Sequence, residues 1–251
     1  MTGGRLFWMH SADNASGAVQ SSLWSASISS GSATMLTSDV GQPLLSGSRY
    51  DLEPTTDRLY WISADGDRTD VTQLRAVALI GGPVSIRTLT GAWQLIGWPW
   101  LVTAPSDPHA PLQFFNLQTD VVTRITVLAN KLVARDRVWC RLLPDHRVRH
   151  EGTDLVRPDG MDRQHVADKY STPIANDPAL LDRFEPLLAP VSQTLAGTSL
   201  FRLSLYDTHR RTQVQIDSAV SKAGAQGDYV WGATGDNETL TWHALDLRTL
   251  D

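Results

Sequence analysis

Apolar and polar residues alternate in short runs along most of the chain, the period-two pattern of half-buried β-strands. The run Leu-Trp-Ser-Ala-Ser-Ile at 23–28 shows this alternation. A short phrase ending in Trp recurs at residues 6–8, 59–61, 137–139 and 229–231. Each copy precedes a polar or Gly-rich loop and, in most cases, a second apolar run. Self-similarity at a period of roughly 40 to 55 residues predicts a repeat architecture.

The pattern divides into six repeats, each with up to four strands, A to D. The first repeat has only strands B to D, at 5–10, 23–28 and 34–36, and the last has only A to C, at 220–224, 228–231 and 240–245. The second repeat supplies all four strands, at 47–52, 58–63, 74–79 and 84–89, and the third begins with a strand at 93 and a second strand at 98–102. Radial repetition that leaves only short protected edges is typical of propellers.

We therefore predict an all-β fold, a β-propeller of six blades of four-stranded antiparallel sheets with the first and last blades incomplete. Five blades is the alternative, because the fifth repeat is irregular, and a flat β-sandwich comes third because it would not repeat regularly. One propeller domain is expected to span residues 1–251, with an irregular insertion at 169–186. Helix is expected only at 178–184, and the two ends are expected to close the ring.

Three strand-to-turn phrases give the chain a family resemblance. Residues 203–208 read Leu-Ser-Leu-Tyr-Asp-Thr, residues 244–249 read Ala-Leu-Asp-Leu-Arg-Thr, and residues 155–160 read Leu-Val-Arg-Pro-Asp-Gly. Together with the Leu-Tyr-Trp type of strand B, they resemble the repeats of TolB-like (PD40-type) β-propeller proteins. The resemblance implies a propeller that serves as a binding scaffold, although some propellers are hydrolases or lyases.

Composition and charge narrow the possible partners. The 251 residues are 41% hydrophobic and 20% charged, which is a globular balance. The net charge of −5 argues against a nucleic-acid partner, and no apolar run is long enough to span a membrane. Cys140 is the single cysteine, so the chain has no internal disulfide, and its place beside Trp139 predicts a buried structural thiol.

The compartment is left open by the sequence. Residues 1–4, Met-Thr-Gly-Gly, lead directly into a strand pattern without a signal peptide. The first repeat begins one strand late, however, as it would if a leader or an upstream domain had been removed. Both cytoplasmic and extracytoplasmic locations therefore remain as alternatives.

Candidate catalytic groups are few. The sequence has no nucleophile elbow, no His-Glu-x-x-His and no phosphate-binding loop. Carboxylate and imidazole groups near predicted strand ends supply the acid and base that hydrolysis or elimination needs. The weak candidates for this role are Asp51, Asp107, His109 and His146.

Aromatic and arginine clusters are the candidates for ligand binding. Trp98 and Trp100 alternate, so they are expected to share one strand face, beside Trp93 from the preceding strand. They form either an aromatic platform or packing between blades. Arg49 and Arg141 are the candidates for carboxylate or phosphate binding. The alternative for the arginine cluster around Arg141 is a solvated strand face paired with Asp136, Asp145 and Glu151.

No metal or cofactor is predicted. The segment 65–70, Asp-Gly-Asp-Arg-Thr-Asp, superficially resembles a calcium loop, but it lacks a closing Glu and strands flank it. A hairpin turn explains it better. The seven histidines are scattered along the chain.

The sequence favours a non-enzymatic binding or scaffold propeller, because many loops sit on a rigid repeat and no catalytic motif is present. Its partner would be a protein, peptide or glycan ligand, with the protein a monomer or a dimer. The alternative is a hydrolase or lyase with its active site at the central channel.

Overall fold

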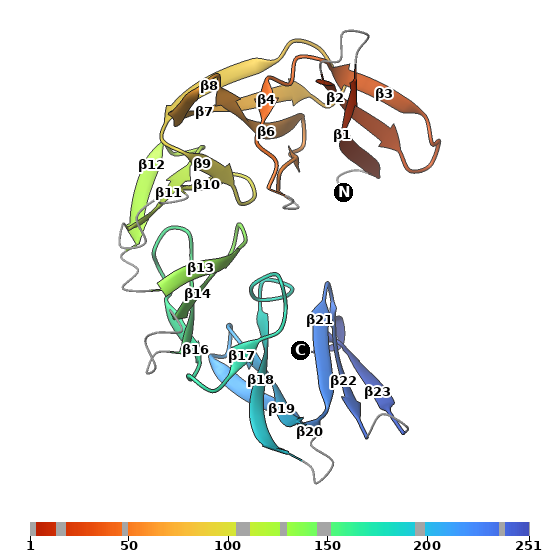
Figure 1. The fold of residues 1–251 in the computed structure, drawn as a ribbon, viewed down its shortest axis with the longest axis vertical. Coiled ribbons are helices and arrows are strands. Elements are labelled where there is room, and N and C mark those ends of the chain that lie inside the picture. The colour runs from red at the N-terminus through yellow and green to blue at the C-terminus, as the bar shows by residue number, and fades with distance from the viewer. Residues whose placement is uncertain are drawn as a thin grey trace. The chain divides into compact units, whose positions relative to one another are not determined.

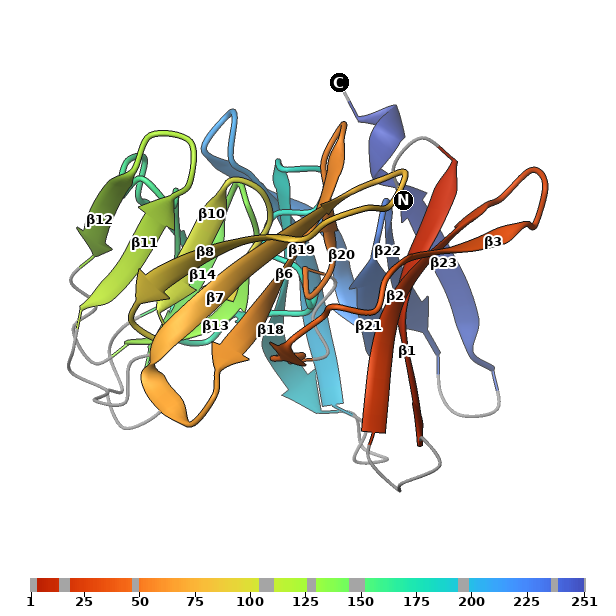
Figure 2. The same ribbon diagram turned by 90° about the horizontal axis from the view of Figure 1, so that it is seen from above.

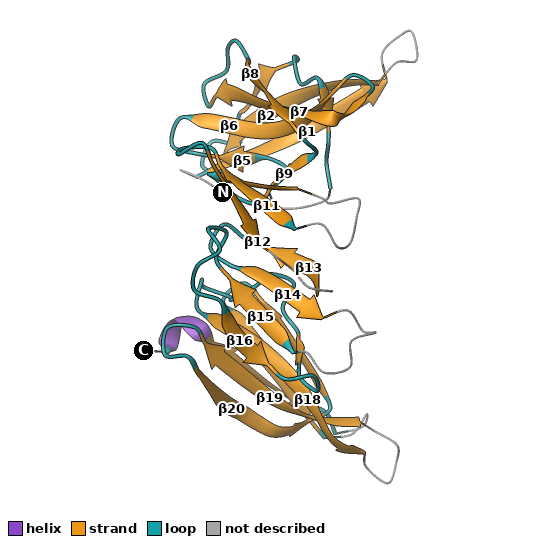
Figure 3. Ribbon diagram, turned by 90° about the vertical axis from the view of Figure 1, so that its left-hand side faces the viewer, coloured by secondary structure: helices purple, strands orange, loops and turns teal. Residues whose placement is uncertain are grey.

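The computed structural model describes residues 4–13, 19–46, 50–103, 111–125, 130–144, 152–193, 199–235 and 239–250. Strands dominate these ranges, and their single helix is the short 3₁₀ turn η1 (Leu247–Thr249) (Figure 3). None of the described helical residues forms a segment long and apolar enough to cross a membrane. The chain divides into two compact units, Met1–Ser106 with Leu112–Val122, and Asp107–Pro111 with Thr123–Asp251.

The first unit contains three antiparallel sheets. The first sheet joins β1 (Arg5–Asp13), β2 (Val19–Ser27) and β3 (Ala33–Thr37). The second joins β4 (Gln42–Pro43), β5 (Glu53–Pro54), β6 (Arg58–Asp65), β7 (Arg68–Ala78) and β8 (Ser85–Thr90). The third joins β9 (Trp93–Leu95), β10 (Trp100–Thr103), β11 (Leu112–Asn116) and β12 (Val121–Ile125), where the boundary between the units falls. Figure 2 shows the long strands β7 and β8 side by side.

The second unit contains three further sheets. Two are four-stranded: β13 (Asn130–Arg135), β14 (Cys140–Pro144), β15 (Thr153–Val156) and β16 (Gln164–Ala167), then β17 (Thr172–Pro173), β18 (Phe184–Gln193), β19 (Ser199–Asp207) and β20 (Thr212–Val220). The last joins β21 (Lys222–Gln226), β22 (Tyr229–Thr234) and β23 (Thr241–Asp246).

The predicted fold class is confirmed: the protein is an all-β propeller built of antiparallel sheets, and three of the six sheets of the described residues have four strands. In the described ranges the strands form six sheets, and the first and last have three strands each (Figure 1). The shorter first and last sheets match the repeats that the sequence pattern left incomplete. The number of blades stays a prediction.

Apolar side chains between neighbouring sheets stabilise each unit. In the first unit, Leu23 and Leu36 of the first sheet pack against Leu59, Trp61 and Val77 of the second. All but Leu36 of these side chains are fully buried, and each contributes about 1.5–3 kcal/mol when it leaves water.

The same turn chemistry ends the third strand in sheets of both units. The side chain of Asn116 accepts hydrogen bonds from the N–H groups of Gln118 and Thr119. Asp207 accepts from two N–H groups of the turn that follows it, and Asp246 caps η1 by accepting from the N–H of Arg248. An Asn or Asp side chain that bonds its own backbone two residues ahead stabilises a turn. The phrases at 203–208 and 244–249 therefore repeat in structure as they do in sequence.

The structure corrects the expected inner strand of the second repeat. The predicted strand at 47–52 is wrong for its described residues, because β4 and β5 pair with β6 instead. β4 lies opposite Ser63 and Ala64, whereas β5 lies opposite Leu59 and Tyr60. The chain thus leaves the sheet edge after Pro43 and returns to it at Glu53.

Two further expectations fail for reasons of backbone conformation. The predicted strand at 98–102 begins only at Trp100, because Trp98 and the cis peptide before Pro99 lie in a turn. The expected helix at 178–184 is a turn with positive φ at Ala179 (47°) and at two later residues, and β18 begins at Phe184. The left-handed region cannot continue a right-handed helix. Within 169–186, where an irregular insertion is expected, β17 pairs with β18, and the insertion stays a prediction.

Candidate ligand-binding site

At the split inner edge of the second sheet, residues 44–46 and 50–52 lie outside the strands, and we call these described residues the 44–52 excursion. Its first residue remains tied to the sheet, because the N–H of Leu44 donates to the carbonyl of Ile62 at 3.0 Å. Within it, Leu44 and Leu45 are each 51% exposed, whereas Tyr50 is buried in the apolar core of the unit. The excursion therefore holds one aromatic anchor and presents two apolar side chains outward.

A cleft of about 710 Å³ lies beside this excursion, and we call it the unit 1 cleft. It lies among the excursion, the β6–β7 hairpin and β9. Its walls are formed by Pro43, Leu44, Leu45, Ser46, Asp51, Ile62, Ala64, Gly66, Asp67, Arg68, Thr69, Val71, Thr72, Ala92, Trp93, Gln94 and Leu95. This volume falls in the range of small-molecule and cofactor sites.

The floor of the cleft is apolar and firmly packed. Ile62, Val71, Trp93 and Leu95 are each at most 7% exposed. Ile62, Trp93 and Leu95 also belong to the core cluster between the second and third sheets. A ligand entering the cleft would meet a preformed apolar surface and would not have to create one.

Hydrogen bonds from Thr72 fix the position of Trp93. The hydroxyl of Thr72 donates to the carbonyl of Gly91 at 2.7 Å and accepts from the N–H of Trp93 at 2.9 Å. The indole N–H of Trp93 donates to the carbonyl of Thr90, so its polar edge is satisfied internally. Gly91 has φ of +113°, and a Cβ there would lie 2.9 Å from the indole nitrogen. Trp93 can therefore offer a ligand only its apolar surface.

The rim of the cleft is polar and carries more acidic than basic groups. Asp51 is half-buried, and its carboxylate accepts a hydrogen bond from the hydroxyl of Ser46 at 2.9 Å. Asp67 lies at the tip of the β6–β7 hairpin. Arg68, beside it, is 3.7 Å from the carboxylates of both Asp65 and Asp70, which compensate its charge. An apolar floor below an acidic rim suits a ligand that is apolar at one end and cationic at the other.

The 65–70 segment forms the hairpin turn that its sequence favours. Gly66 has φ of +62°, and Asp65 lies opposite Arg68 across the turn. Within the ranges described above, no three His, Cys, Asp or Glu side chains are grouped as metal ligands would be.

The three tryptophans lie in different elements, although Trp93 and Trp98 both pack in the core cluster between the second and third sheets. Trp98 does not share a strand face with Trp100, because it lies in the turn before β10. Its ring stacks on Tyr60 with centroids 4.3 Å apart, and its backbone N–H donates to Glu53. Burial raises the pKa of the Tyr60 hydroxyl. Trp93 lines the unit 1 cleft, so of the three it is the one placed against a possible ligand.

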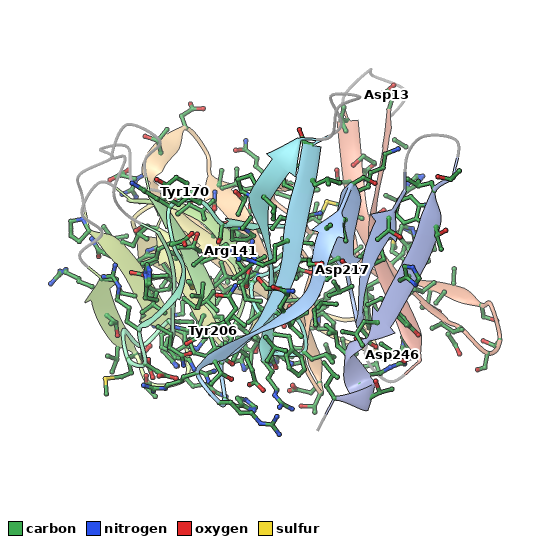
Figure 4. The ribbon with its side chains drawn as sticks, turned by 90° about the horizontal axis from the view of Figure 1, so that it is seen from below. Asp13, Arg141, Tyr170, Tyr206, Asp217 and Asp246 are labelled. Atoms are coloured by element: carbon green, nitrogen blue, oxygen red, sulfur yellow. The ribbon has the colours of Figure 1, made fainter. Side chains whose placement is uncertain are left out.

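Arg141 lies inside the second unit, as Figure 4 shows. Its side chain is 3% exposed and forms a 2.5 Å ion pair with Glu185, which is fully buried. It also donates to the carbonyls of Ala175 and Asp177, each at 2.9 Å. The expectation of a solvated strand face is therefore wrong for this residue. Arg141 binds a carboxylate, as an arginine in this role should, but the carboxylate belongs to its own chain.

Glu185 and Arg141 together hold the turn at 175–183 through hydrogen bonds to its backbone, and we call these contacts the clamp. The second carboxylate oxygen of Glu185 accepts from the N–H of Ala179 at 2.7 Å. Burial raises the pKa of Glu185 to about 7, and the charge of Arg141 opposes the rise only in part. Nearby, the indole N–H of Trp139 donates to the carbonyl of Asp182, and Cys140 is buried as its sequence context predicts. The clamp holds a turn whose residues adopt positive φ.

Of the catalytic candidates, the structure places Asp51 in the unit 1 cleft. Asp107, His109, His146 and the binding candidate Arg49 lie outside the described residues. The sequence reasoning missed Leu44, Leu45 and Ala92 as cleft residues. The available signal was the pair of prolines, Pro43 and Pro54, which bracket a stretch too rich in Ser and Gly for a central strand.

Comparison of the sequence with protein-family models finds no match, and comparison with curated proteins finds none. Solved structures do resemble the fold. The β-propeller domain of the trilobed protease from Pyrococcus furiosus, described as having an open velcro topology, has a TM-score of 0.52 and 9% identity over 98% of this chain and 79% of that one. An acylaminoacyl peptidase in complex with Z-Gly-Gly-Phe-chloromethyl ketone has a TM-score of 0.53 and 11% identity over 98% of this chain and 44% of that one. This chain thus spans less than half of that peptidase, and identities this low establish the β-propeller fold alone.

Proposed function

We propose that this protein is a peptide-binding β-propeller whose unit 1 cleft takes an apolar side chain of the bound peptide. The observation that carries the proposal is the cleft itself, about 710 Å³ with the buried side chains of Ile62, Val71, Trp93 and Leu95 as its floor. Apolar pockets with a few polar groups at the rim are the usual form of a ligand site.

The rim supports a ligand with a positive charge near the apolar group. Asp51 and Asp67 outnumber Arg68 among the charged lining residues, and Arg68 is already paired with two other carboxylates. A peptide amino terminus offers such a charge on a flexible backbone. Peptide as the ligand class also agrees with the similar structures, which are a propeller domain of a protease and a peptidase bound to a peptide-like chloromethyl ketone.

An exposed alanine allows the cleft to be filled without disturbing its floor. Ala92 lines the cleft but is itself exposed, so Ala92→Trp should occupy the cavity at little cost in stability. Ala33→Trp, at an exposed position of β3 away from the cleft, is the matched control. We expect calorimetric titration with Gly-Gly-Phe-amide to show saturable binding that Ala92→Trp reduces at least about tenfold, a loss of about 1.4 kcal/mol.

Two related peptides separate the parts of the ligand. Gly-Gly-Gly-amide lacks the apolar group and should bind at least about tenfold more weakly. The acetylated form of Gly-Gly-Phe-amide lacks the amine and should bind several-fold more weakly if Asp51 and Asp67 attract it. Equal binding by Ala92→Trp and the native protein would place the peptide elsewhere and overturn the proposal.

The alternative function, a hydrolase or lyase at a central channel, has less support. Asp51 is its one candidate within the described residues, and its carboxylate is bonded to Ser46 and borders an apolar floor. Incubating the native protein with Gly-Gly-Phe-amide and following the products by mass spectrometry distinguishes the two functions. We expect the peptide to be recovered intact.

We also propose the family, the number of blades and the class of partner. We place the chain in the TolB-like group because Asp207 and Asp246 stabilise the turns that follow their strands in the same way. Each side chain accepts a hydrogen bond from a backbone N–H two residues ahead. We also propose a single propeller domain of six blades, in line with the six sheets of the described residues. Its partner is a peptide or a peptide segment of another protein.

A further inference from the structure

A group of polar side chains lies on the second sheet behind the unit 1 cleft. We call it the polar network and define it by Asp39, Asp65, Gln73 and Arg75. The guanidinium of Arg75 donates to the carboxylate of Asp39 at 2.7 Å, and its Nε donates to the amide oxygen of Gln73 at 3.0 Å. The amide nitrogen of Gln73 donates in turn to the carboxylate of Asp65 at 2.6 Å. Three successive hydrogen bonds therefore join Asp39 to Asp65 through β7.

Strand register places the network on the opposite face of the sheet from the floor of the cleft. Gln73 lies opposite Ser63, and Arg75 lies opposite Trp61, whose ring packs in the core between the first and second sheets. Residues directly opposite each other share a face of the sheet. Ile62, which belongs to the floor, lies in the core between the second and third sheets instead. None of the four network side chains lines the cleft, so they influence a ligand only through the residues that they hold in place.

One end of the network holds the chain that leads into the 44–52 excursion. The guanidinium of Arg75 and the hydroxyl of Ser63 fill the space beside Gly41, where a Cβ would lie 2.5 Å from the hydroxyl oxygen. The same hydroxyl accepts from the N–H of Gln42, the first residue of β4, at 2.8 Å. Gly41 has φ of +64°, a conformation that suits glycine. The start of β4 is therefore fixed against β6 and β7.

The other end of the network reaches the β6–β7 hairpin, where the regular pairing of the two strands is interrupted. Ala64 lies opposite Thr72, but the next residue, Asp65, lies opposite Arg68. In these two strands, which the structure describes throughout, residues 69–71 thus have no directly opposite residue on β6. An irregularity of this kind disrupts the ladder of backbone hydrogen bonds. The backbone alone therefore fixes the hairpin less firmly than the rest of the strand pair.

The hydrogen bond from Gln73 to Asp65 spans this interruption. It ties the end of β6, from which the hairpin projects, to the part of β7 that pairs regularly. Residues 66–69 follow directly and form one wall of the cleft. At the tip, a Cβ on Gly66 would meet no atom within 4 Å among the residues that the structure describes, so packing does not hold this point in place.

We propose that Gln73 is a positioning residue of the unit 1 cleft, which holds the hairpin where Asp67 meets the amine of the bound peptide. The inference rests on the proposed function and assigns a residue to it that does not touch the ligand. The floor of the cleft depends on core packing around Ile62 and Trp93 instead. Loss of the Gln73 bond should therefore disturb the contact with the amine and leave the contact with the apolar side chain unchanged.

The experiment is a calorimetric titration of Gln73→Leu, in which a side chain of similar size can neither donate nor accept. The preference for Gly-Gly-Phe-amide over its acetylated form measures the amine contact, and we expect it to fall to about twofold or less. The preference for Gly-Gly-Phe-amide over Gly-Gly-Gly-amide measures the apolar contact, and it should equal that of the native protein. Gln213→Leu is the matched control, because Gln213 donates to the hydroxyl of Ser204 at 2.6 Å in the other unit.

A second variant separates positioning from general stability. Asp65→Asn combined with Gln73→Glu exchanges the carboxylate and the amide, so the net charge is kept and the hydrogen bond can form with its donor and acceptor reversed. We expect this double variant to recover the native preference for the free amine. A general loss of stability would shift both preferences or neither, and the exchange would not repair it.

Three results would overturn the inference while leaving the proposed function in place. In the first, Gln73→Leu keeps the native preference for the free amine. In the second, it loses the amine and apolar preferences in parallel, and in the third, the exchange fails to restore the amine preference. Failure of the proposed function is recognised before any change at Gln73, because Ala92→Trp would then bind the peptide as the native protein does. That result would overturn the positioning role as well.

Discussion

Each unit buries an arginine beside an irregular segment. The carboxylate that pairs with this arginine is exposed in the first unit and buried in the second. In the first unit, Arg75 has a side chain that is 10% exposed and pairs at 2.7 Å with Asp39, which is 64% exposed. In the second, Arg141 pairs at 2.5 Å with Glu185, and both side chains are buried. The first pair keeps one charge in water, whereas the second takes both charges out of it.

The arrangement around each arginine shows what the pair holds in place. The Nε of Arg75 donates to Gln73, and its guanidinium fills the space beside Gly41, where a Cβ would come within 2.6 Å of it. It thus secures the chain just before β4 and the 44–52 excursion. Arg141 and Glu185 instead hold backbone carbonyl and N–H groups of the turn at 175–183. The half-solvated pair secures the chain just before the excursion that lines the cleft, and the enclosed pair fixes a turn whose residues adopt positive φ.

Breaking the enclosed pair should have the largest effect on stability. Arg141→Met leaves the Glu185 carboxylate buried without its cation and frees two carbonyls of the turn. We expect the free energy of unfolding, measured by urea titration, to fall by about 3–5 kcal/mol. The double variant Arg141→Met with Glu185→Leu should recover much of this loss, because an apolar pair of similar volume needs no solvation. A double variant as unstable as the single one would contradict this reading of the pair.

The pH dependence of stability should separate Glu185 from the other acidic residues. Its folded-state pKa of about 7 lies above its ordinary value of 4.5, so the folded protein binds this proton more tightly than the unfolded chain. Its contribution to stability is therefore full below about pH 4.5 and is lost as the pH rises toward 7, by a total of about 3 kcal/mol.

Comparison with a variant isolates this contribution from the rest of the protein. Asp207 and Asp168 have lowered pKa values, Asp207 because of hydrogen bonds from Arg183 and the turn backbone, which outweigh its partial burial. Their contributions run the opposite way, lost only as the pH falls into the acid range. Glu185→Gln should remove the loss of stability between pH 4.5 and 7. It should leave unchanged the loss of stability at acid pH that Asp207 and Asp168 cause. If the native protein and Glu185→Gln lose stability in parallel over that interval, Glu185 does not hold the proton.

These two arginines also show how far the sequence could predict the site. Alternation and the recurring Trp phrases were enough for the antiparallel sheets and for the short first and last sheets, because strand patterns depend on local residues. The partner of Arg141 could not be predicted, because Glu185 is 44 residues away and reaches it only through packing of β14 against the turn before β18. The nearer carboxylates, such as Asp136, were the reasonable expectation.

The cleft illustrates the same limit at the level of backbone. Trp93 and Asp51 stood out in the sequence, but for separate roles, and their place in one cavity depends on the excursion between β4 and β5. The sequence pattern predicts a strand at 47–52, but the described residues of that range lie outside the sheet. Pairing of β6 with two short strands, and burial of Tyr50 in the neighbouring core, override that pattern.

The smallest effect we expect is that of Asp39→Asn at the half-solvated pair. Because Asp39 stays 64% exposed, water solvates its carboxylate in the native and unfolded states alike, and the ion pair contributes less than about 1 kcal/mol. Arg75 keeps its bond to Gln73, so the variant should fold normally and lose stability mainly at low ionic strength. Urea titrations of the native protein and Asp39→Asn at low and high salt measure the difference, which should shrink as salt is added. A loss as large as that of Arg141→Met, and insensitive to salt, would mean that the two pairs are buried alike and that the contrast between the units does not hold.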